Sequence, residues 1–374
     1  MKVAIVHDYL NQYGGAEKVI ETLHEIYPNA PIYTSIFQPK NLPTAFSTFD
    51  VRPSFMQNLP FIGRHFKKYL LFFPSAIESF DLSGYDIVLS SSSAFAKGAR
   101  VPDNVCHICY CYSPMRFVWD TESYLSRDNI NPLYSLILPW TLARLKRWDV
   151  KTMKRVDYFV GISDHIRKRI QSVYHRDADV IYPPVDLTSF YISEKHEDYF
   201  LALSRLNAYK SIDLVIEAFN RLSLPLVIIG TGPYLETLKN SSKSNVRFLG
   251  RVSQEEVASY LSKCRGFIFP GIEDFGIAPV EAMASGRPVI AYAGGGALET
   301  VVEGISGLFF KEQTTDSLVE AIEKFTAIEF DSKIIRRHTE QFDKEIFKIK
   351  ISAYVSEKIS EFKEKHSTQV SNQV

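Results

Sequence analysis

The chain has 374 residues, of which 45% are hydrophobic and 23% are charged, and its 43 basic residues balance its 43 acidic residues. This length favours two domains, and the composition is ordinary for a globular protein. Proteins that bind nucleic acid usually carry an excess of basic residues, and this chain has none because its formal net charge is zero. We therefore expect no nucleic-acid partner.

The start of the chain and its cysteines predict a cytoplasmic protein. Met1 is followed almost directly by an apolar segment without a signal peptide, and no apolar run is long enough to span a bilayer. Strand alternation places Cys109 and Cys111 on one face of a strand and Cys106 on the other. One apolar strand offers poor tetrahedral geometry for zinc. We expect these residues and Cys264 to be reduced thiols, and we expect no metal site.

Apolar, β-rich segments alternate with helical segments through the first half of the chain. The predicted strands are residues 3–7, 31–37, 86–92, 107–112, 158–163 and 179–185. Between the first two strands, residues 14–28 carry apolar side chains at helical spacing. Such alternation is typical of a parallel sheet with helices on both faces. The segment PPVD (183–186) and the polar segment 193–198 then predict a domain boundary.

A second alternating series follows this boundary. Its predicted strands are residues 199–206, 224–232, 246–250, 266–270, 288–294 and 307–310, and its predicted helices are 211–222, 234–240, 253–264 and 315–325. We therefore expect an α/β protein with two Rossmann-like domains, 1–185 and 186–340, which face each other across a ligand-binding cleft. Residues 341–366 are predicted to form a helix that crosses back to the first domain, and residues 367–374 to be disordered.

Two carboxylates, Glu273 and Glu281, bracket a loop that runs from an apolar strand into a helix. Pro279 suits the first helical turn, where its missing N–H costs nothing, and we expect Glu281 in that same turn. The amides of residues 275–277 would point at a ligand above the end of the strand. A helix start favours anions, and carboxylates accept hydrogen bonds from hydroxyls, so the pattern suits a nucleotide sugar. For Glu281 alone, a simple preference for the helix dipole is the alternative.

Cations and glycines follow other predicted strands. Arg205 and Lys210 come at the carboxyl end of a strand, where they can clamp a diphosphate, Arg as a planar fork and Lys as a point charge. Gly14 and Gly15 lie between the first strand and its helix, where glycines permit positive φ and close approach of amides to a ligand. They do not form the dinucleotide fingerprint GxGxxG. A solvated loop for Lys210 and an ordinary turn for the glycines are the alternatives.

These residues carry a family resemblance. Nearly all of residues 200–310 resemble the nucleotide-sugar glycosyltransferases of family 4, which have the GT-B fold, in SRLNAYKSIDLVIEAF, VIIGTGP, FLGRVS and FIFPGIEDFGIAPVEAMASGRPVIAYAGGGALETV. The first half resembles one branch of that family, the bacterial mannosyltransferase-like enzymes of polysaccharide and O-antigen assembly. The resembling stretches are HDYLNQYGGAEKV, SFDLSGYDIVLSSSSAFAKG, CYSPMRFVWD and VIYPPVD. The resemblance implies a retaining hexosyltransferase, with mannose from GDP-mannose as the expected donor.

The resemblance also implies a donor site. It would consist of Gly14, Gly15, Arg205, Lys210, Arg251, Val252, Glu273, Asp274, Phe275, Gly276, Ile277 and Glu281. In such enzymes Glu273 would bind sugar hydroxyls near the reacting centre, Glu281 would hold the ribose, and the backbone near Arg251 would meet the base. Arg205 and Lys210 would neutralise the leaving diphosphate. We therefore expect no metal and no cofactor besides the nucleotide sugar.

The chain departs from this branch at Tyr112, where those enzymes carry a His that contacts the donor sugar. A phenol donates and accepts hydrogen bonds, but its ordinary pKa of about 10 makes it a poor base at neutral pH. A front-face route lets the leaving phosphate accept the proton of the acceptor, so we expect activity, with Tyr112, Glu273, Arg205 and Lys210 as catalytic residues. His107 should lie on the opposite face of the strand and should not substitute for the missing His.

The acceptor site is predicted in the first half. His7 and Asp8 end the first strand at the expected cleft, and with Arg116 they are candidates for binding the acceptor. Capping of the strand end is an equal alternative for His7 and Asp8. The resemblance implies a glycan or a lipid-linked oligosaccharide as acceptor. Residues 61–80 and 138–155 mix cations with aromatics, so they either lie on the anionic inner face of the plasma membrane or pack between helices of the first domain.

Two other functions are compatible with the sequence. A relative that binds the donor but catalyses weakly or differently is suggested by Tyr112, and a transfer assay separates it from an active transferase. A sugar-nucleotide epimerase on the same fold would need an acid/base set in the cleft. The sequence offers no clear set of carboxylates and histidines for that chemistry.

Overall fold

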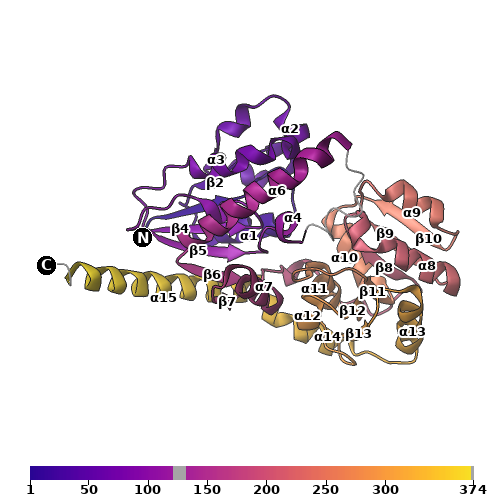
Figure 1. The fold of residues 1–374 in the computed structure, drawn as a ribbon. Coiled ribbons are helices and arrows are strands. Elements are labelled where there is room, and N and C mark those ends of the chain that lie inside the picture. The colour runs from indigo at the N-terminus through magenta and orange to yellow at the C-terminus, as the bar shows by residue number, and fades with distance from the viewer. Residues whose placement is uncertain (121–131, 372–374) are drawn as a thin grey trace. The chain divides into compact units, whose positions relative to one another are not determined.

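The computed structural model describes residues 1–120 and 132–371 (Figure 1). The chain divides into two compact units: unit 1 holds Met1–Pro184 and the chain from Phe347 onward, and unit 2 holds Val185–Ile346. Each unit contains one sheet whose paired strands run parallel. Parallel neighbours need crossover connections, and helices supply most of them, so both units have the predicted α/β architecture.

The sheet of unit 1 has seven strands in the order β3-β2-β1-β4-β5-β6-β7. Their bounds are β1 Val3–His7, β2 Ile32–Thr34, β3 Val51–Pro53, β4 Ile87–Ser92, β5 Cys106–Cys111, β6 Tyr158–Gly161 and β7 Ala178–Val180. Every residue of β1, β4 and β5 is buried, as expected for parallel strands covered on both faces. His7 pairs in register with Ser91 of β4, and Ser91 pairs with Tyr110 of β5, so these strands end close together.

Helices cover both faces of this sheet. Their bounds are α1 Gly15–Ile26, α2 Ile62–His65, α3 Phe73–Glu78, α4 Arg116–Trp119, α6 Pro132–Thr152, α7 Asp164–Tyr174 and α15 Lys344–Ser371. On one face, Phe73 of α3 stacks on Phe95 with 4.8 Å between ring centroids, in a core that includes Val6. On the other face, Phe347 of α15 packs edge-on against Tyr110 at 5.6 Å.

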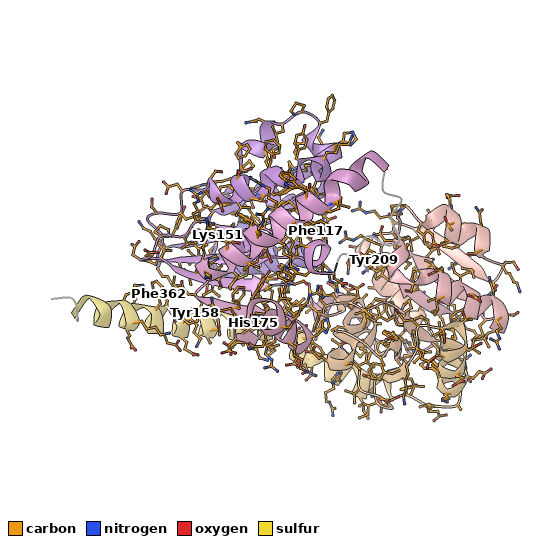
Figure 2. All side chains as sticks on the ribbon, viewed as in Figure 1. Phe117, Lys151, Tyr158, His175, Tyr209 and Phe362 are labelled. Carbon is orange, nitrogen blue, oxygen red and sulfur yellow. The ribbon has the colours of Figure 1, made fainter. Side chains whose placement is uncertain are left out.

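Helix α15 is fixed along the last strands of this sheet. The hydroxyl of Tyr354 donates to Asp179 of β7 at 3.0 Å, and the ammonium of Lys358 lies 5.5 Å from the ring centroid of Tyr158 on β6. Tyr158 and Phe362 are labelled in Figure 2, and the side chain of Phe362 is 7% exposed. Aromatic and cation–π contacts therefore continue the packing of this helix well beyond its first turns.

A buried ion pair ties together the helices on one side of unit 1. Lys97, in a short 3-10 turn after β4, donates to Asp149 of α6, and the two residues are 1% and 0% exposed. The other carboxylate oxygen of Asp149 accepts from Trp119 Nε1 at 2.7 Å and from the Tyr174 hydroxyl at 2.8 Å. One carboxylate thus joins segments from α4, α6 and α7, and its charge is compensated by an ammonium and two neutral donors.

The sheet of unit 2 has six strands in the order β10-β9-β8-β11-β12-β13. Their bounds are β8 Phe200–Leu203, β9 Leu226–Ile229, β10 Val246–Gly250, β11 Gly266–Phe269, β12 Val289–Tyr292 and β13 Gly307–Phe310. The helices are α8 Ile212–Leu222, α9 Leu235–Ser241, α10 Gln254–Lys263, α11 Ile277–Ala284, α12 Ala297–Thr300, α13 Thr315–Thr326 and α14 Ser332–Thr339. Helix α8 contacts α9 and α13, whereas α11 contacts α10, α12 and α14.

Glycines allow two loops of unit 2 to touch through their backbones. A Cβ on Gly296 would overlap Cα of Phe275, and a Cβ on Gly295 would overlap the carbonyl oxygen of Glu273. The amide of Gly296 donates to that same carbonyl at 2.8 Å. The loop after β12 therefore supports the loop that carries Glu273, at a distance that leaves no room for side chains.

The structure confirms the predicted alternation, because every predicted strand overlaps an observed one. Strand β3 was not predicted, because this three-residue edge strand ends in Pro53, is mostly exposed and lacks the apolar run that identifies a buried strand. The predicted disorder of the C-terminal tail is wrong up to Ser371, because α15 continues to that residue. Residues 372–374 lie outside the described part of the chain.

Replacing Asp149 with alanine should destabilise unit 1 by about 3–5 kcal/mol, because the ammonium of Lys97 would be left buried without its counter-charge. The chain has 3 tryptophans, Trp119, Trp140 and Trp148, and all lie in unit 1, so urea unfolding followed by tryptophan fluorescence reports on this unit. The double variant Lys97→Met/Asp149→Leu removes both charges and should lose much less stability. Equal losses in the two variants would show that charge compensation is not what Asp149 contributes.

Replacing Gly296 with alanine should destabilise unit 2 by about 1–3 kcal/mol, because the added methyl group overlaps the backbone of Phe275. Hydrogen exchange followed by mass spectrometry should show faster exchange in residues 273–277 of this variant. Gly271→Ala is the matched control, since a Cβ there would meet its nearest atoms at 3.5 Å or more. If both variants exchange alike, close backbone packing does not hold this loop.

Candidate functional site

The candidate site of unit 2 lies at the carboxyl ends of β8 and β11. These strands pair directly, while β9 and β10 follow on the side of β8, and β12 and β13 on the side of β11. Loops that leave neighbouring strands at such a reversal of strand order turn in opposite directions, and the crevice between them is where α/β sheets bind ligands. Lys210 follows β8 and Glu273 follows β11, so the fold brings together residues that are distant in the sequence.

Lys210 and Glu273 form a direct ion pair. The ammonium of Lys210 donates to Oε1 of Glu273, and the side chains are 15% and 27% exposed. The same ammonium lies 5.1 Å from the ring centroid of Tyr209, which is labelled in Figure 2. A cation predicted to meet phosphate and a carboxylate predicted to meet sugar hydroxyls therefore lie at one point, and both are partly accessible.

The helix that follows β11 begins at Ile277. Gly276 is its N-cap, with φ of +87°, a conformation that glycine adopts at little cost. Pro279 lies in the first turn, as predicted. Glu281 was expected in that turn but lies in the second, because the helix begins two residues before Pro279. The Glu281 side chain is 6% exposed, and a first-turn preference for the helix dipole does not explain it.

The remaining predicted donor residues of this loop are held by packing. Asp274 and Ile277 are half-buried, and Phe275 is buried with its ring centroid 5.5 Å from that of Phe342. Together with the contact between Gly296 and the Glu273 carbonyl, this packing fixes the backbone of the loop.

Arg205 and Arg251 occupy other positions along the same edge of the sheet. Arg205 is exposed on the loop after β8, and the amide of Leu206 donates to the carbonyl of Thr231 at 3.0 Å, which ties this loop to the one after β9. Arg251 and Val252 follow β10, two strands away from β8. Neighbouring strands are about 4.8 Å apart, so these loops are spread over roughly 10 Å, which suits an extended ligand.

In unit 1, His7 and Tyr112 are connected through a serine. His7 Nδ1 lies 3.0 Å from Ser91 Oγ, and Ser91 Oγ lies 2.8 Å from the Tyr112 hydroxyl. Tyr112 in turn donates to the carbonyl of Ala16 in α1 at 3.2 Å. Burial raises the pKa of Tyr112 well above its ordinary value, so the phenol stays protonated at neutral pH. In this environment Tyr112 is a hydrogen-bonding group and not a base.

The carboxylate of Asp8 is occupied within unit 1. One oxygen accepts from the amide and hydroxyl of Ser93 and from the amide of Ala94, and the other accepts from the amides of Phe95 and Ala96, at 2.6–2.9 Å. Asp8 is 1% exposed. These bonds cap the turn after β4, the alternative weighed for this residue, and the role of Asp8 in binding an acceptor stays a prediction.

The other predicted residues of unit 1 lie at helix starts. Gly14 is the N-cap of α1 with φ of −159°, and neither Gly14 nor Gly15 adopts the positive φ that glycine permits. Their place at the start of α1 still lets its amides face a ligand. Arg116 begins α4 and is half-buried, and this short helix is held by the bond from Trp119 to Asp149.

Ser91 and Glu17 also lie next to His7, and neither was predicted from the sequence. Ser91 is 0% exposed, and Glu17, in the first turn of α1, is 3% exposed with its Oε1 3.9 Å from His7 Nε2. The available signals were a serine-rich strand end and an acidic residue next to Gly15. His107 bonds Ser90 at 2.8 Å, so it points away from Tyr112 as predicted. Among residues 1–120 and 132–371, no group of His, Cys, Asp and Glu side chains is arranged to hold a metal ion.

Two family models match the chain. The model described as "Glycosyltransferase Family 4" matches residues 13–189, and the model described as "Glycosyl transferases group 1" matches residues 189–342. The matched segments contain Gly14 and Tyr112 in unit 1 and Lys210 and Glu273 in unit 2.

Curated relatives include several mannosyltransferases. The human alpha-1,3/1,6-mannosyltransferase ALG2 is 28% identical over 302 residues, covering 69% of this chain and 67% of that protein. A "GDP-mannose-dependent alpha-(1-6)-phosphatidylinositol monomannoside mannosyltransferase" of Mycobacterium tuberculosis is 30% identical over 198 residues, covering 44% and 51%. The uncharacterized glycosyltransferase MJ1178 of Methanocaldococcus jannaschii is 29% identical over 193 residues, covering 50% and 55%. The chain thus spans 51–67% of these relatives' length.

Solved structures share the fold over nearly the whole chain. Anabaena Alr3699/HepE in complex with UDP has a TM-score of 0.72 at 17% identity, covering 96% of this chain and 100% of that one. Sucrose-phosphate synthase from Thermosynechococcus elongatus has a TM-score of 0.72 at 16% identity, covering 96% and 99%. The two parallel sheets, the family models and these neighbours agree: the chain belongs to glycosyltransferase family 4 and has the GT-B fold.

Proposed function

We propose that this glycosyltransferase is a retaining mannosyltransferase that moves mannose from GDP-mannose to a glycan or a lipid-linked oligosaccharide. The observation that carries the proposal is the Lys210–Glu273 pair at the reversal of strand order in unit 2. GDP-mannose offers a diphosphate to the cation and hydroxyls to the carboxylate. The relatives support this donor, since several are mannosyltransferases and the Mycobacterium tuberculosis protein is GDP-mannose-dependent by name.

In the proposed reaction, the bond between the anomeric carbon and the leaving diphosphate breaks. The acceptor oxygen bonds to the same carbon from the face on which the diphosphate departs. Negative charge grows on the diphosphate, where Arg205 acts as a planar donor fork and Lys210 as a point charge. The proton of the acceptor hydroxyl passes to the leaving phosphate oxygen, so the route needs no base from the protein. We assign the charge stabilisation to these cations and to the helix start at Ile277, without a metal or another cofactor.

The ion pair also prepares Glu273 for the sugar. Before the donor binds, Lys210 and Glu273 neutralise each other, which lowers the cost of holding either charge in a partly buried place. A diphosphate then competes for Lys210, and the Glu273 oxygens become free to accept bonds from sugar hydroxyls. Glu281 is assigned to the ribose, and the backbone at Arg251 and Val252 to the base.

A second candidate function is favoured by one observation, the environment of Tyr112. Its phenol replaces the His of the resembling branch, and burial keeps it protonated. A protein with this residue could hold the donor tightly and transfer it poorly. Tight donor binding without transfer or hydrolysis, after mixing with labelled nucleotide sugars and plausible acceptors, would favour this second function.

The melting temperature should rise when the correct donor binds. At a donor concentration of roughly 100 times the Kd, binding should stabilise the folded protein by about 2.7 kcal/mol. We expect GDP-mannose and GDP to give this shift and UDP-glucose and UDP to give a much smaller one. Arg205→Ala and Glu281→Ala should lose most of the shift, because they remove the proposed phosphate and ribose contacts. The measurement is differential scanning fluorimetry over a series of nucleotide concentrations.

The control for this experiment is Arg221→Ala, which removes an exposed arginine from α8 that pairs with Asp316 instead of facing the candidate site. It should keep the full shift. A full shift in both Arg205→Ala and Glu281→Ala would place the donor elsewhere. A larger shift with UDP-glucose than with GDP-mannose would leave the proposed site standing but would show that GDP-mannose is not the preferred donor.

The proposal includes contact with a membrane surface. In residues 61–80, Phe73 and Ile77 are buried, but Phe61, Leu71 and Phe72 are 81%, 36% and 48% exposed. Phe61 adopts φ of +52°, which is costly for a bulky side chain, so the chain holds an exposed aromatic in a strained conformation. We call these three exposed side chains, the aromatic Phe61 and Phe72 and the aliphatic Leu71, the aromatic patch. The neighbouring Lys68 is also exposed, and the combination suits the anionic inner face of the plasma membrane.

The other candidate segment, residues 138–155, belongs mainly to α6 and shows more packing. Leu145 is 1% exposed, and Trp148 packs partly buried against the core of unit 1, although Trp140 is 54% exposed. Along residues 1–120 and 132–371, no helix has both the length and the apolar character needed to cross a bilayer. The proposed contact is therefore peripheral and rests on the aromatic patch.

Flotation with liposomes that contain phosphatidylserine should carry the protein upward at low salt, and Phe61→Ser/Phe72→Ser should abolish most of this association by removing apolar area. Tyr191→Ser and Ile349→Ser are matched controls, because these side chains are 50% and 66% exposed outside the patch. Both controls should float like the unmodified protein. Absence of flotation in the unmodified protein, or equal loss in the controls, would overturn the membrane proposal.

A further inference from the structure

Strand β4 carries two buried serine–histidine pairs on opposite faces. Ser90 Oγ lies 2.8 Å from His107 Nε2, and Ser91 Oγ lies 3.0 Å from His7 Nδ1. The first pair connects only to the backbone, because His107 Nδ1 lies 2.8 Å from the carbonyl of Arg155. The second continues to Tyr112, whose hydroxyl is 2.8 Å from Ser91 Oγ. Only the second pair therefore leads to a residue proposed to take part in sugar transfer.

The direction of the hydrogen bonds in the second pair follows from chemistry. His7 Nδ1 also lies 3.2 Å from the carbonyl oxygen of Ser91, which can only accept, and a proton on Nδ1 is the arrangement that satisfies both contacts. Ser91 Oγ then accepts from His7 and gives its single proton to the oxygen of Tyr112. Tyr112 must direct its own proton elsewhere, and it donates to the carbonyl of Ala16. The chain of donors runs from His7 through Ser91 to Tyr112.

The last bond of this chain is the weakest. The distance from the Tyr112 hydroxyl to the Ala16 carbonyl is 3.2 Å, whereas hydroxyl donors usually lie about 2.7–2.8 Å from their acceptors. A sugar hydroxyl that accepts the Tyr112 proton would replace a long contact, which costs little. At the other end, Glu17 Oε1 lies 3.9 Å from His7 Nε2 with both side chains 3% exposed, so a buried carboxylate lies near the far side of the histidine ring but beyond hydrogen-bond distance.

We propose that His7, acting through Ser91, is a positioning residue that keeps the proton of Tyr112 directed away from Ser91, so that the phenol can donate to a sugar hydroxyl. The inference rests on the proposed transferase function. The resembling branch is expected to carry a histidine at position 112. In this chain the imidazole of His7 on β1 instead contacts Tyr112 through the hydroxyl of Ser91.

Kinetics of sugar transfer test this role. Ser91→Ala breaks the chain without touching His7 or Tyr112, and it should lower kcat about tenfold to a hundredfold with little change in the KM for the donor. The matched control is Ser90→Ala, which breaks an equally buried serine–histidine bond on the same strand and should leave kcat unchanged. Tyr112→Phe should lower kcat similarly. Adding Ser91→Ala to Tyr112→Phe should then cause no further loss, because the serine acts only through the tyrosine.

A measurement without substrate separates this inference from the proposed function. With histidine labelled at its ring nitrogens, NMR should show His7 protonated at Nδ1. Ser91→Ala should shift the His7 signals and spare those of His107, and Ser90→Ala should do the reverse. Failure of the unmodified protein to transfer sugar from any nucleotide sugar tested would overturn the transferase proposal, while these spectra would still decide the hydrogen-bond chain.

Three results would overturn the positioning role. The first is wild-type kcat in folded Ser91→Ala, with an unchanged melting temperature as the check on folding. The second is an additive loss in the double variant, since a serine that supports only the fold would act independently of the Tyr112 hydroxyl. The third is a His7 spectrum that does not respond to Ser91→Ala.

Discussion

The reversal of strand order between β8 and β11 is the constraint on which the candidate site of unit 2 depends. Because the chain leaves these two paired strands toward opposite sides, the loop with Lys210 and the loop with Glu273 are adjacent at the edge of the sheet and diverge from there. The packing of Gly296 against Phe275 and the capping of α11 by Gly276 then fix the second loop. Without this reversal, the same residues would lie on separate parts of the edge.

The carboxylates of this protein differ in how many hydrogen bonds they accept and in how exposed they are. Asp8 accepts five hydrogen bonds at 1% exposure, and Asp149 accepts from an ammonium, an indole and a phenol at 0% exposure. The hydrogen bonds of these two groups hold helices and turns in place. Glu273 differs, because it pairs with Lys210 while 27% of its side chain remains exposed. That accessibility is what a ligand-binding acid needs.

Much of the fold and part of the site follow from local patterns in the sequence. Buried parallel strands are continuous apolar runs, so the predicted strands overlap the observed ones, and Pro279 and Gly276 mark the start of α11. The ion pair between Lys210 and Glu273 was not predicted as a contact, because it depends on which strands pair. The bond from Ser91 to His7 has the same origin, since the order of β1, β4 and β5 brings these residues together. The sequence also does not show which glycines use their conformational freedom, since Gly14 has φ of −159° whereas Gly276 has φ of +87°.

The two units differ in the chemistry that they place at their strand ends. Unit 2 presents Lys210 beside Glu273 and Arg205 on the same loop as Lys210, a charged set suited to a ligand whose reacting part becomes more negative as it leaves. Unit 1 presents the hydroxyl of Tyr112, held by Ser91 and His7, which can direct a hydrogen bond but cannot take a proton while burial keeps its pKa high. The proposed transfer, in which the leaving phosphate accepts the proton, needs both kinds of group. It requires cations near the phosphate, and near the sugar it requires a hydrogen-bond donor of fixed direction but no base. A phenol at position 112, where the resembling branch is expected to carry an imidazole, is therefore compatible with the proposed transfer, provided that the phenol is held in one direction.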